Sequence, residues 1–403
     1  MAVARARYIP DLVQVHIDDL AFVWGQRREA LVSHRHTLRE FGELSERLEA
    51  HLQGVLVAPA DALASLLQPQ LANPDRDEAF AAAYALLRLS DTASTHAVVV
   101  EFSRAQGPAL AGLRDAFSLA PHSLFAAEMR SALEQAKPTA AVAAAAVLAN
   151  HQLLDAASPR LSRLLDDEDE TVAQLAWRVV TVVDVTPKAT PPPRPYKAAL
   201  AHANAGVRHA AWAAAAWTGQ ATAMPLLRQT AATGDAAALH WLAVLGQESD
   251  APVIQKAALA MDDPKERCEL LSRFGHPSAL NALLRWMAGD DVPLAVAARR
   301  AFTRITGQDI RGERRTLPVP DDADDFTREM APDVWMPDVD KARALLDRDG
   351  ATWAGCTRWC NGLRLDAVPP RELLVQLDLE ARWDAAARAC MAGQVISAPP
   401  PIH

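Results

Sequence analysis

The chain has 403 residues and carries 41 basic against 50 acidic side chains, a formal net charge of −9, which argues against nucleic acids and anionic membranes as partners because both favour a basic protein surface. Half of the residues are hydrophobic but only 5% are aromatic, a composition typical of closely packed helices rich in Ala, Leu and Val. Because the chain has only four cysteines, no apparent leader peptide and no run of about 20 apolar residues, we expect a soluble, cytoplasmic protein without a disulfide framework.

Residues 1–57 are expected to form a helical N-terminal segment. Four apolar residues repeat at helical spacing and therefore share one face: Ile17, Leu20, Ala21 and Trp24. Thr37 and Glu40 match a capping box, in which the two side chains bind free backbone N–H groups at a helix start. A further helix is therefore predicted to begin after Thr37.

Residues 58–307 are predicted to form an array of helix pairs. Apolar stripes recur here and are separated by short polar turns, near residues 166–169, 203–206, 234–235, 262–264 and 289–291. Successive turns lie roughly 27 to 37 residues apart, the size of a helix-pair repeat. One helix pair cannot bury its apolar side alone, so stacking of successive pairs into an all-α fold, an α-solenoid, follows. The stretch SPRLSRLLDDEDETVAQLAWRVV at residues 158–180 looks like a HEAT repeat.

A compact helical bundle is the alternative architecture, because the repeat spacing is irregular and a proline run, Pro191–Pro195, interrupts the array. Proline lacks the backbone N–H that a helix interior needs. We interpret this run as a rigid connection between two parts of the array.

The repeat pattern stops after Gly307. Residues 308–340 contain several prolines and aspartates and are predicted to form an extended, acidic connection. Residues 341–403 are predicted to form a C-terminal segment of two or three helices, one marked by Leu373, Leu374 and Leu377 and another by the stretch 380–391. The two terminal helical segments would then cap the array.

Three separated parts of the chain resemble one protein family. They are YIPDLVQVHIDDLAFVWGQRR (residues 8–28) followed by LSERLEAHLQG (44–54), AFTRITGQDI (301–310), and the stretch around Trp353 and Trp359 that leads into NGLRL (361–365). Together they are similar to a family of bacterial HEAT-repeat proteins that are often encoded beside type VI secretion spike and tip components. The resemblance implies an accessory or adaptor role in that system, and it assigns no functional residue.

A protein–protein interaction scaffold is the function that the pattern favours. Binding energy concentrates in a few aromatic and Arg anchors, and three tryptophans of the array are the candidates: Trp212, Trp217 and Trp241. A run of aspartates is interpreted as a solvated connection or, functionally, as an acidic arm that docks a basic partner: Asp321, Asp322, Asp324 and Asp325. The expected partner is a protein, such as a secretion spike or effector component.

No metal or cofactor site is predicted from the histidines and acids. His16 is followed by Asp18 and Asp19, but adjacent helix residues point in different directions, so the trio is not expected to converge on one ion. The five consecutive acids at 166–170 lack the alternating ligands and the central Gly of a calcium loop. They are interpreted as a solvated turn.

Cys356 and Cys360 could share a helix face, but a structural zinc site usually needs a second ligand pair. They are interpreted as ordinary buried thiols. No Gly-rich phosphate loop, nucleophile elbow or His-Glu dipeptide occurs, so we do not expect an enzyme. An enzyme with an unrecognised site on a HEAT-like scaffold, or a nucleic-acid-binding HEAT protein, are the alternatives.

Overall fold

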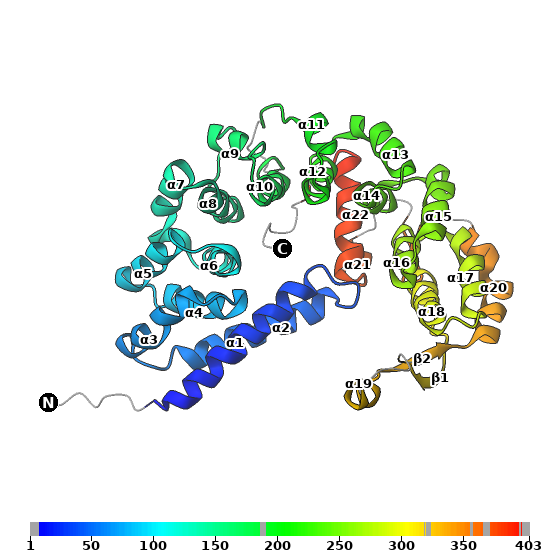
Figure 1. Ribbon diagram of the computed structural model, residues 1–403, viewed down its shortest axis with the longest axis horizontal. Coiled ribbons are helices and arrows are strands. Elements are labelled where there is room, and N and C mark those ends of the chain that lie inside the picture. The colour runs from blue at the N-terminus through cyan, green and yellow to red at the C-terminus, as the bar shows by residue number, and fades with distance from the viewer. Residues whose placement is uncertain are drawn as a thin grey trace. The chain divides into compact units, whose positions relative to one another are not determined.

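The computed structural model describes residues 8–185, 191–317, 319, 324–354, 358–365, 371–394 and 396. This part of the chain is mostly helical, as the all-α prediction requires, and it adds two antiparallel sheets of two strands each (Figure 1). Backbone contacts divide the chain into two compact units. Unit 1 comprises Met1–Gly219, Asp378–Trp383 and Gly393–His403, and unit 2 comprises Gln220–Leu377 and Asp384–Ala392.

Unit 1 begins with two long helices, α1 (Pro10–Ala30) and α2 (Leu38–Val55), which pack together. The capping box predicted at the start of α2 is confirmed, because Thr37 and Glu40 bind each other's backbone N–H groups. The other helices of unit 1 are α3 (Ala60–Leu67), η1 (Gln68–Ala72), α4 (Arg76–Arg88), α5 (Thr92–Phe102), α6 (Gly107–Leu119), η2 (His122–Leu124), α7 (Ala126–Gln135), α8 (Pro138–Asn150), α9 (Pro159–Leu164), α10 (Glu170–Val183), α11 (Tyr196–Leu200) and α12 (Ala205–Trp217).

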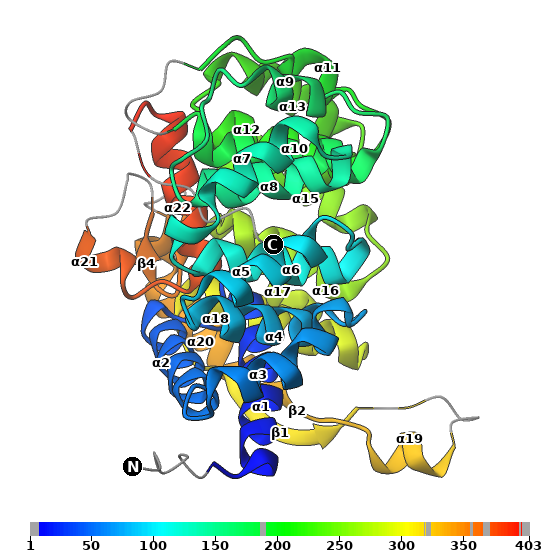
Figure 2. The same cartoon turned by 90° about the vertical axis from the view of Figure 1, so that its left-hand side faces the viewer.

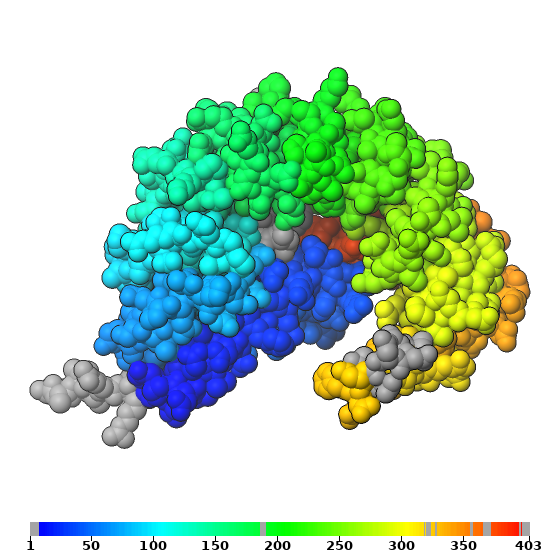
Figure 3. Space-filling view, viewed as in Figure 1, coloured from blue at the N-terminus to red at the C-terminus, as the bar shows by residue number. Residues whose placement is uncertain are grey.

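Five helices of unit 1, α4, α6, α8, α10 and α12, form its inner layer. Helix α4 packs on α6, α6 on α8, α8 on α10 and α10 on α12, while α5, α7, α9 and α11 lie in a second layer outside them (Figures 1 and 2). In the space-filling view, successive segments of this unit touch in sequence order (Figure 3). Ala-rich sequences allow this close approach, and residues 140–149 of α8 are all buried. The inner helices therefore form much of the core of unit 1.

Polar residues in the turns of unit 1 cap the next helix. Asp169, within the acidic run at 166–170, accepts the backbone N–H of Thr171 at 2.9 Å and so caps α10. Asn204 caps α12 in the same way. Such caps satisfy backbone donors that have no partner within the helix. Within the acidic run, Asp169 therefore acts as a helix cap in an exposed turn.

The proline run does more than connect helices. Arg194, the one residue of Pro191–Pro195 that is not proline, binds both carboxylate oxygens of Asp184 at 2.7 and 2.9 Å. Both side chains are only 2% exposed, and Arg194 also donates to the carbonyl oxygen of Ala156 at 2.8 Å. A buried ion pair therefore holds this run against α9 and α10.

Unit 2 continues the helical pattern with η3 (Ala221–Ala223), α13 (Met224–Ala232), α14 (Ala236–Leu245), η4 (Glu248–Asp250), α15 (Ala251–Ala260), α16 (Pro264–Phe274), η5 (Pro277–Ala279), α17 (Leu280–Met287) and α18 (Val292–Thr306). Helix α14 packs on α16, and α16 packs on α18. The C-terminal elements follow: β1 (Arg311–Thr316), α19 (Asp325–Glu329), β2 (Asp333–Pro337), α20 (Val339–Ala354), β3 (Trp359–Cys360), β4 (Leu363–Arg364), α21 (Arg371–Leu374) and α22 (Leu379–Met391).

The stretch 308–340 differs from the predicted acidic connection, because strands β1 and β2 pair within it as an antiparallel ladder. Arg314 lies opposite Trp335, and its guanidinium carbon lies 5.5 Å from the centroid of the Trp335 ring. Arg311 pairs with Asp309 at 2.7 Å. The arginines of β1 thus form ion pairs with nearby acidic residues. The prediction of an acidic connection did not include these pairs.

Strands β3 and β4 were also missed, although an Asn-Gly pair lies between them. Asn361 and Gly362 have φ angles of +50° and +76°, and the register pairs Trp359 with Arg364. An Asn-Gly turn of this kind is the commonest short hairpin connection. The predicted helix at 380–391 is present as α22, whereas α21 is only a single short turn.

No single helix in the described ranges is both long and apolar enough to cross a membrane. The helical stretches Leu38–Val55 and Ala60–Ala72 reach that threshold only as a pair, and the chain bends by 110° between them.

Candidate anion-binding site

The three tryptophans predicted as partner anchors lie in the cores of the two units. The exposed fractions of Trp212, Trp217 and Trp241 are 1%, 5% and 6%. Trp217 packs near Trp383 of α22, with ring centroids 6.3 Å apart. An anchor offers its ring to a partner, and these rings are already covered by the chain itself. We therefore interpret all three as packing residues.

The predicted acidic arm is described only in part. Asp324 and Asp325 are exposed, and Asp325 opens α19. Asp321 and Asp322 lie outside the described residues. Docking of a basic partner by this arm stays a prediction.

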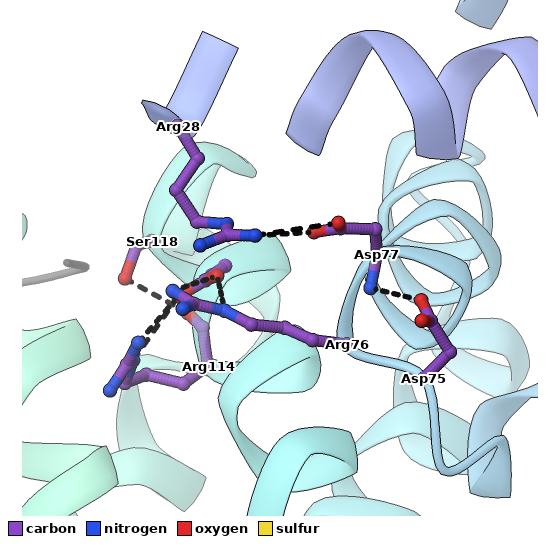
Figure 4. Close-up of polar contacts among 7 residues, drawn as sticks. Arg28, Asp75, Arg76, Asp77, Arg114 and Ser118 are labelled. Atoms are coloured by element: carbon purple, nitrogen blue, oxygen red, sulfur yellow. Dashed lines mark hydrogen bonds and ion pairs between the residues drawn. The ribbon is translucent and has the colours of Figure 1, made fainter. Parts of the chain in front are cut away.

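A group of arginines in unit 1, which we call the arginine cluster, brings together side chains from four helices. Arg28 comes from α1, Arg76 from the first turn of α4, Arg114 from α6 and Arg178 from α10. Figure 4 shows the first three with their carboxylate partners. The packing of α4 on α1 and α6 brings these chain-distant residues close to one another.

Asp115 holds two members of the arginine cluster. Its carboxylate is fully buried and accepts Nε and Nη2 of Arg76 at 2.8 and 2.7 Å. The other carboxylate oxygen accepts Nη2 of Arg114 at 2.9 Å. One buried negative charge is therefore shared between two guanidinium groups. Such charge-assisted bonds are stronger than neutral ones, and they fix the orientation of both arginines.

Arg28 faces Asp77 more loosely, with both carboxylate oxygens 3.4 Å from its Nη2. Burial raises the pKa of Asp77, and the positive charge of Arg28 only partly opposes that effect. Asp75 contributes little to the arginines, because its side chain caps α4 by accepting the backbone N–H groups of Asp77 and Glu78. The Arg28–Asp77 pair is thus weaker than the contacts of Asp115.

Among the described residues, Arg178 has no acidic partner. Its side chain is half-buried in the middle of α10, and no hydrogen bond or ion pair of its guanidinium occurs within the described part of the chain. Burial lowers the pKa of Arg178, and the positive charges of Arg114 and Arg76 lower it further. Arginine nevertheless stays protonated in proteins. The cluster therefore contains a positive charge that the described carboxylates leave uncompensated.

The charges of this site favour an anion. Arg178 adds a guanidinium group beside Arg76 and Arg114, and its charged neighbours among the described residues are these two arginines. Guanidinium groups match carboxylate and phosphate oxygens geometrically, since two parallel N–H groups can donate to one anion. Partial burial strengthens such a contact, because it lowers the local dielectric constant.

Sequence reasoning missed this site because its members are spread from residue 28 to residue 178. One local signal was present. Arg114 lies inside a run of buried residues of α6, and Arg178 lies between buried Trp177 and Val179 of α10. Arginine is almost never buried without a partner, so an arginine within an apolar stripe marks a polar site inside the packing.

Cys268, Cys360 and Cys390 are buried, while Cys356 lies outside the described residues. Burial raises the pKa of the Cys268 thiol to about 12. Of the two cysteines interpreted as buried thiols, Cys360 is confirmed as buried.

Neither the models of known protein families nor the curated proteins searched contain a match to this chain. The resemblance to bacterial HEAT-repeat proteins therefore stays a prediction.

Proposed function

We propose that this chain is a protein–protein interaction scaffold and that its arginine cluster binds an acidic segment of a partner protein. The observation that carries the proposal is the position of Arg178, which is half-buried beside Arg76 and Arg114 and has no carboxylate partner among the described residues. An incoming carboxylate would relieve the repulsion among these guanidinium groups. Recognition of acidic motifs by grouped arginines is a recurring binding mode.

The layered helices support a scaffold role. In unit 1 each inner helix packs on the next inner helix along the chain, which is the arrangement expected of stacked HEAT-like pairs in an α-solenoid. Arg76, Arg114 and Arg178 all come from this inner row. A peptide that runs across the row could meet them in succession.

A short acidic peptide fits this chain better than a nucleic acid does. The formal charge of −9 repels a long polyanion, whose binding depends on the neutralisation of many phosphates. A few carboxylates need only the local positive charge of the arginine cluster.

The proposal extends to the biological setting through the family resemblance alone. We propose a cytoplasmic accessory or adaptor protein of a type VI secretion system, whose partner is a spike or effector component with an exposed acidic segment.

The experiment compares two arginines in different settings. A fluorescein-labelled peptide rich in Asp and Glu is titrated with the full chain, and binding is followed by fluorescence anisotropy at low and at physiological salt. Arg178→Gln should weaken binding by about tenfold or more, since hydrogen bonds to charged groups contribute about 1.5–3 kcal/mol. Arg130→Gln is the matched control, because Arg130 lies exposed on α7 outside the cluster, and it should leave the dissociation constant unchanged.

Circular dichroism establishes that both variants fold. Equal affinities of the Arg178→Gln and Arg130→Gln proteins would overturn the assignment of the site. If a single-stranded oligonucleotide binds more tightly than the peptide and loses affinity in Arg178→Gln, the ligand of the site is a nucleic acid and not an acidic peptide.

A further inference from the structure

A second polar group in unit 1 lies on α1 and α2, and it involves only one of the two acids that follow His16. Asp18, two residues after His16, does not share its helix face. It accepts a hydrogen bond from the side chain of Gln14 at 2.8 Å. Asp19, three residues after His16, shares its helix face. Helix α2 adds His51. The prediction that no ion site forms here omitted this third group, which the packing of α1 on α2 supplies.

The three side chains converge on one point. The Nδ1 atoms of His16 and His51 lie 3.3 Å apart, and Oδ2 of Asp19 lies 3.5 Å from Nδ1 of His51. One potential ligand atom from each residue falls within 4.8 Å of the others. Zinc–nitrogen bonds of about 2.0–2.1 Å place neighbouring ligands of a tetrahedron about 3.3 Å apart. Two of the three spacings thus already match a tetrahedral edge.

The imidazole ring of His16 occupies the space beside Gly54 of α2 that a side chain would fill. A Cβ atom at this position would lie 2.5 Å from Cδ2 and 2.7 Å from Nε2 of His16. The imidazole therefore rests directly on the backbone of α2, with its Nε2 side against the glycine. This leaves Nδ1 of His16 as the nitrogen that faces His51. The position of the ring depends on the absence of a side chain at residue 54.

We propose that His16, Asp19 and His51 bind a divalent zinc ion. Two imidazoles and one carboxylate are a donor set that zinc accepts with three protein ligands, leaving a fourth position for water. All three residues are half-buried, so an ion can reach them from solvent. The ion would link α1 to α2 and neutralise Asp19. This site is independent of the arginine cluster.

The test uses untagged full-length protein, so that no purification histidines compete. Zinc binding is measured by competition with a chromogenic chelator, and Co²⁺ serves as a spectroscopic probe because tetrahedral nitrogen–oxygen coordination gives visible absorption bands. We expect one Zn²⁺ bound per chain, a raised midpoint of thermal unfolding, and no comparable effect of Mg²⁺, which prefers octahedral oxygen ligands.

Two matched pairs of variants identify the ligands. Asp19→Asn should weaken zinc binding by about tenfold or more, because even residues that only support a ligand contribute about 10–100-fold. Asp18→Asn, at the preceding residue, should not weaken it. Gly54→Ala should displace His16 and weaken binding, whereas Gly42→Ala, with no atom within 4 Å of the added Cβ, should leave it unchanged. His51→Ala should abolish the visible cobalt bands.

The side chain of Asp19 is 47% exposed, so we expect the Asp19→Asn variant to fold. It therefore still tests the site if His51→Ala does not fold. Equal zinc dissociation constants for the wild type, Asp19→Asn and Gly54→Ala would overturn the proposal. So would stoichiometric binding that survives in Asp19→Asn but is lost on substitution of the exposed His96.

Discussion

Asn361 donates its backbone N–H to the carbonyl oxygen of Arg304 at 2.5 Å. Next to it, Gly362 donates to Ile305 at 3.2 Å, and Trp359 donates to Gly275 just beyond α16 at 2.8 Å. The last carbonyl groups of a helix have no partner within the helix. The β3–β4 hairpin therefore satisfies the C-terminal ends of α18 and α16, and in doing so it joins two of the stretches on which the family resemblance rests.

Gly307→Ala should destabilise unit 2. Gly307 follows α18 with a φ angle of +69°, and an added Cβ would lie 2.6 Å from the carbonyl oxygen of Asn361. The left-handed conformation alone costs a non-glycine residue about 1–2 kcal/mol, and the clash with the hairpin adds to that. Urea unfolding followed by circular dichroism measures the loss.

The control for this substitution is Gly350→Ala. Gly350 lies inside α20, and no atom lies within 4 Å of an added Cβ. Alanine is favoured over glycine in helix interiors by about 0.5–1 kcal/mol, so this variant should be at least as stable as the wild type. If Gly307→Ala behaved like Gly350→Ala, the close approach of the hairpin to α18 would be wrong.

Asp115→Asn should lower the free energy of unfolding by about 3–5 kcal/mol, the usual cost of removing one partner from a buried charge pair. The substitution leaves the guanidinium groups of Arg76 and Arg114 without their shared carboxylate. Asp61→Asn, at an exposed position of α3, should change stability by no more than about 0.5 kcal/mol. A similarly small effect of Asp115→Asn would contradict the buried geometry around the arginine cluster.

Arg194 and Asp184 should show strong energetic coupling. Replacing either one alone leaves a charge in a site where both side chains are 2% exposed, and each single variant should lose about 3–5 kcal/mol. The double variant Arg194→Met with Asp184→Leu removes both charges and should recover much of that loss. Additive losses in this double-mutant cycle would show that the pair does not interact.

Unit 1 should lose stability as the pH falls below neutral, because of His151. Burial lowers the pKa of His151 in the folded chain, and its Nε2 lies 2.8 Å from the carbonyl oxygen of Phe117. Below the unfolded pKa of about 6.5 the unfolded chain therefore binds more protons, so the free energy of unfolding decreases until the pH reaches the folded pKa.

His151→Gln retains a donor for the carbonyl group of Phe117 but cannot titrate, so it should flatten the dependence of stability on pH between about 7 and 5. His96→Gln, at an exposed position of α5, should retain the wild-type slope. Urea midpoints measured across this range separate the two variants, and an unchanged slope in His151→Gln would contradict the assignment.

Local patterns in the sequence were enough to predict several individual helices. The helical spacing of Ile17, Leu20 and Trp24 predicted a buried stripe on α1, and all three are buried. Thr37 with Glu40 predicted the start of α2. These features depend on residues within one or two turns of each other, which is the distance over which helix propensity, capping and amphipathicity act.

The sites depended on packing between helices that are remote in sequence. Whether Arg178 meets a carboxylate, or whether Asp19 meets a second histidine, is decided by which helices lie side by side, and helical spacing carries no information on that. Helix packing also decided which aromatic side chains are buried. Helical spacing is compatible with Trp212 and Trp217 facing a groove, but both lie in the core. The sequence by itself therefore determined several helices and the cap of α2, while the tertiary structure alone decided which charges share a site, because electrostatic contacts form between neighbours in space.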